Sequence, residues 1–205
     1  MQNTLSTLKS KLMYKLLSER TVFSDIFHLE EGRIQYTDEA GKPHKEFSRL
    51  RLNRQNASAV FIYNQETKKV VLVRQFRYAI AAKSPEPILE IMAGRISVGE
   101  DPLETALRES IEECGYRIRK ENIQLLSSFF ASPGYSSEKF FLYYATVTNA
   151  DKVALGGGLE DEDEYIEVVE MTYPDFFKLL DENKIEDAKT LMAGLYVRAN
   201  VSFSR

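Results

Sequence analysis

Residues 94–116 read GRISVGEDPLETALRESIEECGY and carry three glutamates, Glu109, Glu112 and Glu113, near the end of a helical pattern. Successive residues of an α-helix are rotated by about 100°, so Glu109 and Glu113 project in nearly the same direction. Like charges four residues apart destabilise a helix by roughly 0.2–0.5 kcal/mol. Because Arg108 is the one cation beside these acids in the sequence, the pattern favours a divalent metal ion as their missing partner.

The same stretch predicts one short α-helix. Asp101 suits the N-cap, Pro102 the first helical position, and Gly115 the left-handed residue that ends a helix. Residues that can be buried recur at the spacing of one helical stripe, at Leu103, Ala106, Leu107, Ser110, Ile111 and Cys114. We therefore expect the core on one side of the helix, with Arg108 and the three glutamates on the opposite side.

Carboxylate oxygens in this arrangement suit Mg²⁺ or Mn²⁺. Mg²⁺ binds through one or two carboxylates and keeps water molecules for a phosphate substrate. An acidic solvent-exposed surface is the alternative, because most charge clusters are of that kind. The residues that flank the cluster distinguish between the two interpretations.

The spacing of the fixed residues resembles the Nudix box, the motif of the Nudix hydrolases. Five residues separate Gly94 from Glu100, and seven separate Glu100 from Arg108. The remainder follows the pattern Arg-Glu-U-x-Glu-Glu-x-Gly-U, where U is bulky and apolar, and every fixed position matches. Ser110 and Tyr116 stand where an aliphatic residue is usual, which concerns local packing and not chemistry. A match of this length at fixed spacing is highly specific.

Composition limits the class of protein. With 205 residues, of which 43% are hydrophobic, the chain can bury the core of one domain with a small additional lobe. A net charge of −4 and a pI near 5.4 argue against nucleic acid as the partner. The lone cysteine, Cys114, excludes an internal disulfide and lies on the buried stripe. No apolar run is long enough to span a bilayer, so we expect a cytoplasmic protein without a membrane partner.

The first 55 residues have a pattern of their own. An amphipathic helix or a frayed lead-in is predicted over residues 4–19, and strands over 21–29, 33–37 and 44–52 with a turn at 38–43. A few short strands are marginally stable alone, so we expect them to pack on the main domain or on a second copy of the chain. In the nucleotide-sugar branch of the Nudix family such a sheet is part of the dimer. The resemblance therefore implies a homodimer with residues 1–55 as the dimerisation lobe and 56–205 as the Nudix domain.

Arg74 and Arg77 lie beside aromatic residues in the string VRQFRYA. They are either ordinary edge-strand residues or contacts for phosphate, ribose and base. The string resembles the same segment of ADP-ribose and GDP-mannose pyrophosphatases, where an arginine contacts the substrate. The resemblance therefore assigns both arginines to substrate binding.

Glu90 is a carboxylate inside the apolar strand PILEIMA. Buried acids need partners, and a salt bridge to a core arginine such as Arg108 is the ordinary explanation. The Glu-x-x-Ala-Gly pattern also resembles the segment before the Nudix box. There the carbonyl matching Ala93 binds metal and the glutamate matching Glu90 lies close to the site.

Two loops also resemble the nucleotide-sugar branch. Residues 132–138 read SPGYSSE, which is ordinary turn chemistry but is similar to a substrate loop and so assigns Tyr135 and Glu138 to the substrate. Three glycines followed by an acidic run lead to the strand at 165–171. A bare acidic run is usually a solvated loop, yet in the family a glutamate on this loop helps to activate water. Alignment from the strand gives Glu164 this role, and alignment from the glycines gives it to Glu162.

The resemblance implies an α/β fold: a Nudix α/β/α sandwich with a mixed sheet, preceded by a small antiparallel sheet and ending in helices over 174–183 and 187–200. It implies metal-dependent hydrolysis of a nucleoside diphosphate sugar, ADP-ribose or GDP-mannose, to a nucleoside monophosphate and a sugar phosphate. The alternatives are a non-catalytic nucleotide-sensing Nudix module and a structural dimer with a calcium-binding surface. The catalytic candidates are Glu164, Glu162, Glu112 and Arg108. The candidate metal-binding residues are Ala93, Glu109, Glu113 and Glu90, with Mg²⁺ or Mn²⁺ as cofactor.

Overall fold

The computed structural model describes residues 13–159 and 163–200, which form two compact units. The first unit comprises the described residues up to Arg54 together with Ser132–Glu138. The second comprises the described residues of Gln55–Ala131 and those from Lys139 onward. Residues 1–12 and the candidate Glu162 lie outside the described residues.

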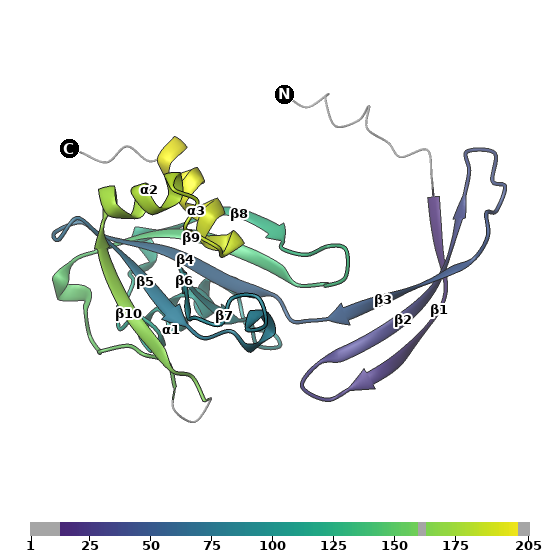
Figure 1. The fold of residues 1–205 in the computed structure, drawn as a ribbon, viewed down its shortest axis with the longest axis horizontal. Coiled ribbons are helices and arrows are strands. Elements are labelled where there is room, and N and C mark those ends of the chain that lie inside the picture. Colours follow the sequence, from purple (N-terminus) through teal and green to yellow (C-terminus); the bar gives the residue numbers. More distant parts are fainter. Residues whose placement is uncertain (1–12, 160–162, 201–205) are drawn as a thin grey trace. The chain divides into compact units, whose positions relative to one another are not determined.

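The first unit is an antiparallel sheet, as the strand pattern predicted (Figure 1). Its strands follow one another in the order β1 (Met13–Ser24), β2 (His28–Thr37) and β3 (Phe47–Asn53). The helix predicted over 4–19 is wrong for residues 13–19, which belong to β1. Cross-strand pairing of Tyr14 with Tyr36 and of Leu16 with Ile34 explains the difference, because helical spacing of leucines does not exclude a strand whose apolar residues meet partners across the sheet.

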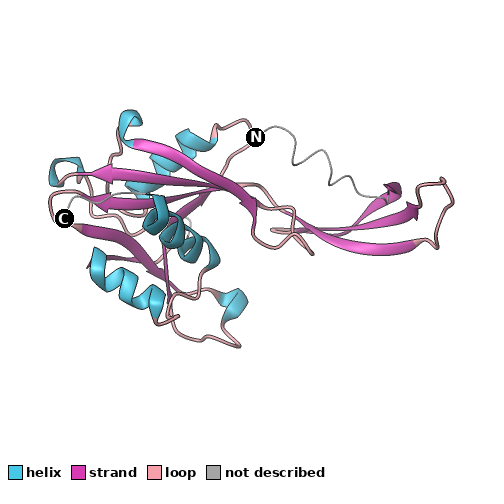
Figure 2. Cartoon of the chain, turned by 90° about the horizontal axis from the view of Figure 1, so that it is seen from above, coloured by secondary structure: helices cyan, strands magenta, loops and turns pink. Residues whose placement is uncertain are grey.

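The second unit is a mixed sheet with helices on both faces (Figure 2). Its strands are β4 (Ala57–Asn64), β5 (Lys69–Gln75), β6 (Ile88–Glu90), β7 (Met92–Arg95), β8 (Ile123–Phe130), β9 (Lys139–Val147) and β10 (Ile166–Thr172). Its helices are α1 (Pro102–Glu112), α2 (Tyr173–Asp181) and α3 (Ala188–Asn200), with 3₁₀ turns at Tyr78–Ile80, Lys120–Asn122 and Asn149–Asp151. The α/β class and the sandwich architecture are therefore confirmed.

The sheet runs in the order β10-β5-β4-β9-β8, with β6 beside β5 and β7 beside β4. Strands β4 and β9 are parallel, and the other pairs are antiparallel. This topology brings β6 and β7, which precede α1 in the chain, next to the central strands. The segment that leads into the glutamate helix is therefore held by the sheet.

Strand β4 is buried along its whole length because both of its faces are covered. Successive side chains of a strand point to opposite faces. Phe61 and Tyr63 pack in the core cluster that includes Phe176 of α2, whereas Val60 and Ile62 pack in the cluster that includes residues of α1. Two cores therefore exist in this unit, one under α2 and α3 and one under α1.

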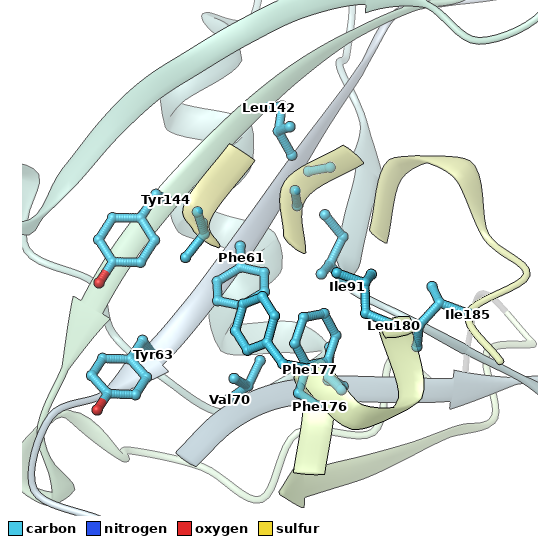
Figure 3. Close-up of a cluster of buried hydrophobic side chains, with 14 residues drawn as sticks. Phe61, Tyr63, Val70, Ile91, Leu142, Tyr144, Phe176, Phe177, Leu180 and Ile185 are labelled. Atoms are coloured by element: carbon cyan, nitrogen blue, oxygen red, sulfur yellow. The ribbon is translucent and has the colours of Figure 1, made fainter. Parts of the chain in front are cut away.

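The core under α2 and α3 is built on close aromatic contacts (Figure 3). The rings of Phe61 and Phe176 meet edge to face, with centroids 5.3 Å apart. Helix α3 approaches closely because Gly194 has no side chain; a Cβ there would lie 2.9 Å from Cε1 of Phe176. No helix in the described part of the chain combines the length and apolar character needed to cross a membrane.

Candidate active site

Helix α1 is fixed at both of its ends. The Asp101 side chain accepts a hydrogen bond from the Leu103 N–H at 2.8 Å, and Pro102 stands in the first turn, where its missing N–H costs no hydrogen bond. Gly115 follows the helix with φ +74°, and a Cβ on it would lie 2.2 Å from the Ala154 carbonyl oxygen. The predicted cap, first-turn proline and terminal glycine are confirmed.

Glu109 and Glu113 are buried, with only 8% and 4% of each residue exposed. Strand β7 lies against them: a Cβ on Gly94 would lie 1.8 Å from Cδ of Glu109, and the Ala93 N–H donates to Oε2 of Glu113 at 3.3 Å. The sequence indicated that these glutamates lie opposite the apolar stripe of the helix, but it did not indicate that β7 would pack against them.

Burial raises the pKa of both carboxyl groups. It raises the pKa of Glu109 to about 7, an effect that Arg108 opposes and the Glu112 charge reinforces. It raises the pKa of Glu113 to about 8, and the charges of Glu109 and Glu164 add to the effect. A bound divalent cation would relieve both the desolvation and the mutual repulsion. Two buried carboxylates of this kind fit a hard, oxygen-preferring metal ion.

Arg108 binds several acids of the motif with one guanidinium. Its Nη1 donates to Oε1 of Glu109 at 3.0 Å and to Oε2 of Glu112 at 2.7 Å, and its Nε donates to Oε1 of Glu100 at 3.2 Å. Hydrogen bonds from Arg108 and from the Ser97 N–H lower the pKa of Glu100 to about 2. The geometry makes Arg108 a positioning group that orients the glutamates.

Glu90 is occupied by two cations. Nε and Nη2 of Arg77 donate to its two carboxylate oxygens at 2.7 and 3.0 Å, and Nζ of Lys189 contacts Oε2 as well. The suggested pairing with Arg108 is therefore wrong. Both oxygens of Glu90 already have cationic partners, which distinguishes this glutamate from Glu113.

The glycine loop, Gly156–Gly158, binds the C-terminal end of α1. The Gly157 N–H donates to the Glu113 carbonyl oxygen at 2.8 Å, and the Gly158 N–H donates to that of Glu112 at 3.1 Å. The last carbonyls of a helix have no partner within the helix, so the loop supplies the donors they lack. All three glycines have positive φ angles, which only glycine adopts without strain.

The glycine loop leads to Glu164, which is one of the residues lining a pocket of about 530 Å³. The pocket is lined by Arg74, Phe76, Pro87, Gly157, Glu164, Tyr165, Ile166 and Glu167. Nη1 of Arg74 lies 3.0 Å from Oε2 of Glu167. The structure thus brings the predicted substrate residue Arg74 to the same pocket as the predicted base.

The two remaining substrate candidates, Tyr135 and Glu138, belong to the first unit. There Nε of Arg54 donates to Oε1 of Glu138 at 3.2 Å, and the Tyr135 carbonyl accepts from the Leu52 N–H at 2.7 Å. Their contact with substrate stays a prediction.

Ser110 and Tyr116, which replace the usual aliphatic residues of the motif, are hydrogen-bonded to each other. The Tyr116 N–H donates to the Ser110 carbonyl, and the Ser110 hydroxyl lies 3.0 Å from the Tyr116 carbonyl. The Tyr116 hydroxyl donates to Glu170 of β10 at 2.8 Å. These polar groups therefore find partners where aliphatic side chains would only pack.

The NUDIX domain family model matches residues 53–193. The chain belongs to the Nudix family. Nudix hydrolases generally use divalent metal ions, although within residues 13–159 and 163–200 of this Nudix hydrolase no three acidic, histidine or cysteine side chains are grouped as ligands of one ion.

Curated relatives of this Nudix hydrolase match it over most of their length. It is 33% identical to a methanol dehydrogenase activator from Bacillus methanolicus (91% of this chain, 96% of the relative) and 30% identical to an ADP-ribose pyrophosphatase from Bacillus subtilis (90% and 95%). It is 33% identical to a GDP-mannose pyrophosphatase from Cronobacter sakazakii (88% and 93%). A solved structure described as an ADP compounds hydrolase has the same fold, with a TM-score of 0.71 and 24% identity over 93% of this chain and 95% of that one.

Sequence reasoning missed Lys189 of this Nudix hydrolase as part of the site. The side chain is 9% exposed and pairs with Glu90. The signal was present, since a buried acid requires a cation, and Lys189 stands at the start of a helix in the segment Asp187-Ala188-Lys189-Thr190.

Substituting Gly94→Ala should destabilise this Nudix hydrolase. The new Cβ would overlap the Glu109 carboxylate, and overpacking of this kind costs about 1–3 kcal/mol. Urea denaturation would measure the loss against Gly134→Ala, where nothing lies within 4 Å of an added Cβ. Equal free energies of unfolding for the two variants would contradict the close approach of β7 to Glu109.

Glu100 should contribute stability that depends on pH. Its folded-state pKa of about 2 lies below the ordinary 4.5, so its stabilisation is present above pH 4.5 and is lost as the pH falls toward 2. Because 39% of the Arg108 side chain is exposed, we expect Glu100→Gln to cost only about 1 kcal/mol at pH 7. Chemical denaturation at pH 7, 5 and 3 should show the difference from wild type shrinking, and Glu121→Gln, at an exposed glutamate of the Lys120–Asn122 turn, is the control. A difference that stays constant down to pH 3 would exclude the ion pair as its source.

Proposed function

We propose that this Nudix hydrolase cleaves the diphosphate of a nucleoside diphosphate sugar, with ADP-ribose and GDP-mannose as the leading substrates. The products are a nucleoside monophosphate and a sugar phosphate. The observation that carries the proposal is the buried pair Glu109 and Glu113 on helix α1. The C-terminal end of that helix is hydrogen-bonded to the glycine loop, which leads to Glu164. The ADP-ribose and GDP-mannose pyrophosphatases among its relatives support the choice of substrate.

The metal-binding residues in this proposal are Glu109 and Glu113, assisted by Glu112 and by the Ala93 carbonyl. Mg²⁺ or Mn²⁺ bound there would neutralise phosphate charge and lower the pKa of a coordinated water. We leave Glu90 out of this set, because Arg77 and Lys189 already occupy its oxygens. Glu90 instead supports the strand that carries Ala93.

The chain's own residues would divide the remaining work. Glu164, or Glu162 outside the described residues, accepts the proton of the attacking water. The water oxygen bonds to one phosphorus while the bridging P–O bond breaks and the second phosphate leaves. Arg74 and Arg77 bind phosphate oxygens, and Arg108 keeps Glu109 and Glu112 in place.

Product release from a substrate panel should distinguish hydrolase from sensor. The panel contains ADP-ribose, GDP-mannose, UDP-glucose, NADH and diadenosine polyphosphates, each with Mg²⁺ and with chelator. We expect turnover of ADP-ribose or GDP-mannose that needs Mg²⁺. Loss of the Glu113 charge in Glu113→Gln should lower it at least about 100-fold. Glu104→Gln, on the exposed start of the same helix, is the control. Tight binding of one compound without any turnover would instead support a non-catalytic nucleotide sensor.

We also propose that the first unit mediates a homodimer. Among its described residues only Gly32 is buried, so the sheet has no core of its own. Its large exposed apolar residues are Met13, Tyr14, Leu16, Val22, Phe23, Ile26, Phe27, Tyr36, Leu50 and Tyr135. Tyr14, Leu16 and Tyr36 share one face of the sheet with Ile34 and Phe47, because each is paired directly across the strands. An exposed apolar face of this kind needs a partner, and a second copy of the chain is the partner we propose.

Placing a charge on this face should separate the subunits. Tyr36→Lys would put an ammonium group in the apolar face, while Gln35→Lys would put it on the opposite face one residue away. We expect sedimentation analysis at micromolar concentration to show a dimer for wild type and Gln35→Lys and a monomer for Tyr36→Lys. Identical sedimentation of all three proteins would contradict a dimer through this face.

A further inference from the structure

Glu90 is the centre of a buried charge network. It is 2% exposed and lies in β6, three residues before Ala93. Arg77 binds both of its oxygens, and Lys189 binds Oε2 from the start of α3. One buried carboxylate therefore has two cationic partners.

The network also includes side chains at the N-terminal end of α3. Nζ of Lys189 lies 3.0 Å from Oδ1 of Asp187, and Oδ2 of Asp187 accepts the Thr190 N–H at 2.9 Å. The Thr190 hydroxyl oxygen accepts the Ile91 N–H at 2.7 Å. Two acids and two cations make the network neutral, and the same turn of chain holds both the side chain of Glu90 and the backbone next to it.

The two cations differ in exposure. The Arg77 side chain is 40% exposed, whereas that of Lys189 is 9% exposed. Arg77 binds Glu90, and Ala93, three residues further along the chain, donates its N–H to Glu113 of the proposed metal site at 3.3 Å. Arg77 is therefore the partner of Glu90 that solvent and substrate can reach, and Lys189 is the partner that stays inside.

A buried carboxylate that loses its cation is strongly destabilising. If Arg77 were the sole partner of Glu90, its transfer to a substrate phosphate would leave an unpaired charge in the interior. With Lys189 in place, Glu90 remains paired after Arg77 departs. The second cation thus reduces the electrostatic cost of moving the first, although Lys189 is shared with Asp187.

We propose that Lys189 is a positioning residue that frees Arg77 for substrate by keeping Glu90 paired while the guanidinium transfers to a phosphate. The inference rests on the proposed phosphate-binding function of this site. Lys189 does not touch substrate; it acts through Glu90 and Arg77.

Removing the lysine should therefore weaken substrate binding and not the chemical step. In Lys189→Met, Glu90 retains only Arg77 and holds it. We expect the KM for ADP-ribose or GDP-mannose to rise about tenfold with kcat within about twofold of wild type, which corresponds to a loss of uniform binding. Lys189→Arg should keep a low KM. Lys184→Met, which removes an exposed lysine of the neighbouring loop, is the matched control and should leave KM unchanged.

The rescue variant separates this role from a merely structural one. In Glu90→Gln/Lys189→Met the negative charge that holds Arg77 is gone, so KM should return to within about twofold of wild type. A KM that stays high in the double variant, or a KM that is normal in Lys189→Met, would overturn the proposal.

Binding provides a second measurement that does not need turnover. The probes are the α,β-methylene analogues of ADP-ribose and GDP-mannose with Mg²⁺, in which carbon replaces the bridging oxygen, followed by calorimetry. We expect the Kd values to follow the same order as the KM values. Wild type and the rescue variant should bind the analogue equally well, and Lys189→Met should bind it about tenfold more weakly. Binding in this order without hydrolysis of either parent compound would retain the inference while removing the hydrolase proposal. Wild-type protein that neither binds nor hydrolyses would remove both.

Discussion

The structure depends on burying two like charges on consecutive turns of one helix. Glu109 and Glu113 are largely withdrawn from water by β7, and the resulting desolvation is the first cause of the raised pKa of each. Burial of this kind is unfavourable unless a cation or hydrogen bonds compensate. Arg108 compensates at Glu109, and the Ala93 N–H does so at Glu113. Residues immediately before and within the same motif thus offset part of the energetic cost, and the raised pKa values show that the rest is left for a bound cation to relieve.

The surrounding elements hold this pair from three sides. Strand β7 covers the carboxylates, the glycine loop binds the end of the helix, and the turn at Asp187–Thr190 fixes the strand that leads into β7. These elements come from distant parts of the chain, and backbone N–H groups make several of the contacts. The position of the glutamates is therefore set by the surrounding backbone as well as by their own side chains.

Patterns that are local in sequence predicted the structure well. The cap at Asp101, the terminal Gly115 and the buried Cys114 all follow from neighbouring residues in the sequence and could be predicted from it. Contacts between distant segments were not readable. Helical spacing gave no indication that β7 would cover Glu109, and Glu90 offered several arginines as partners while Lys189 lies 99 residues away. The strand at residues 13–19 was misread because its apolar spacing fits a helix until its partner strand is known.

Gly157 links the end of α1 to the start of β10. Its N–H donates to the Glu113 carbonyl at 2.8 Å, and its own carbonyl accepts the Ile166 N–H at 3.1 Å. The two ends of the segment between Gly157 and Ile166 are therefore held next to each other. Glu164 lies two residues before Ile166, a chain length of about 7 Å. Its position is therefore set by the end of α1 and by the edge strand β10. A substitution that removed either hydrogen bond of Gly157, at the end of α1 or at the start of β10, would therefore also release the Glu164 carboxylate from its position.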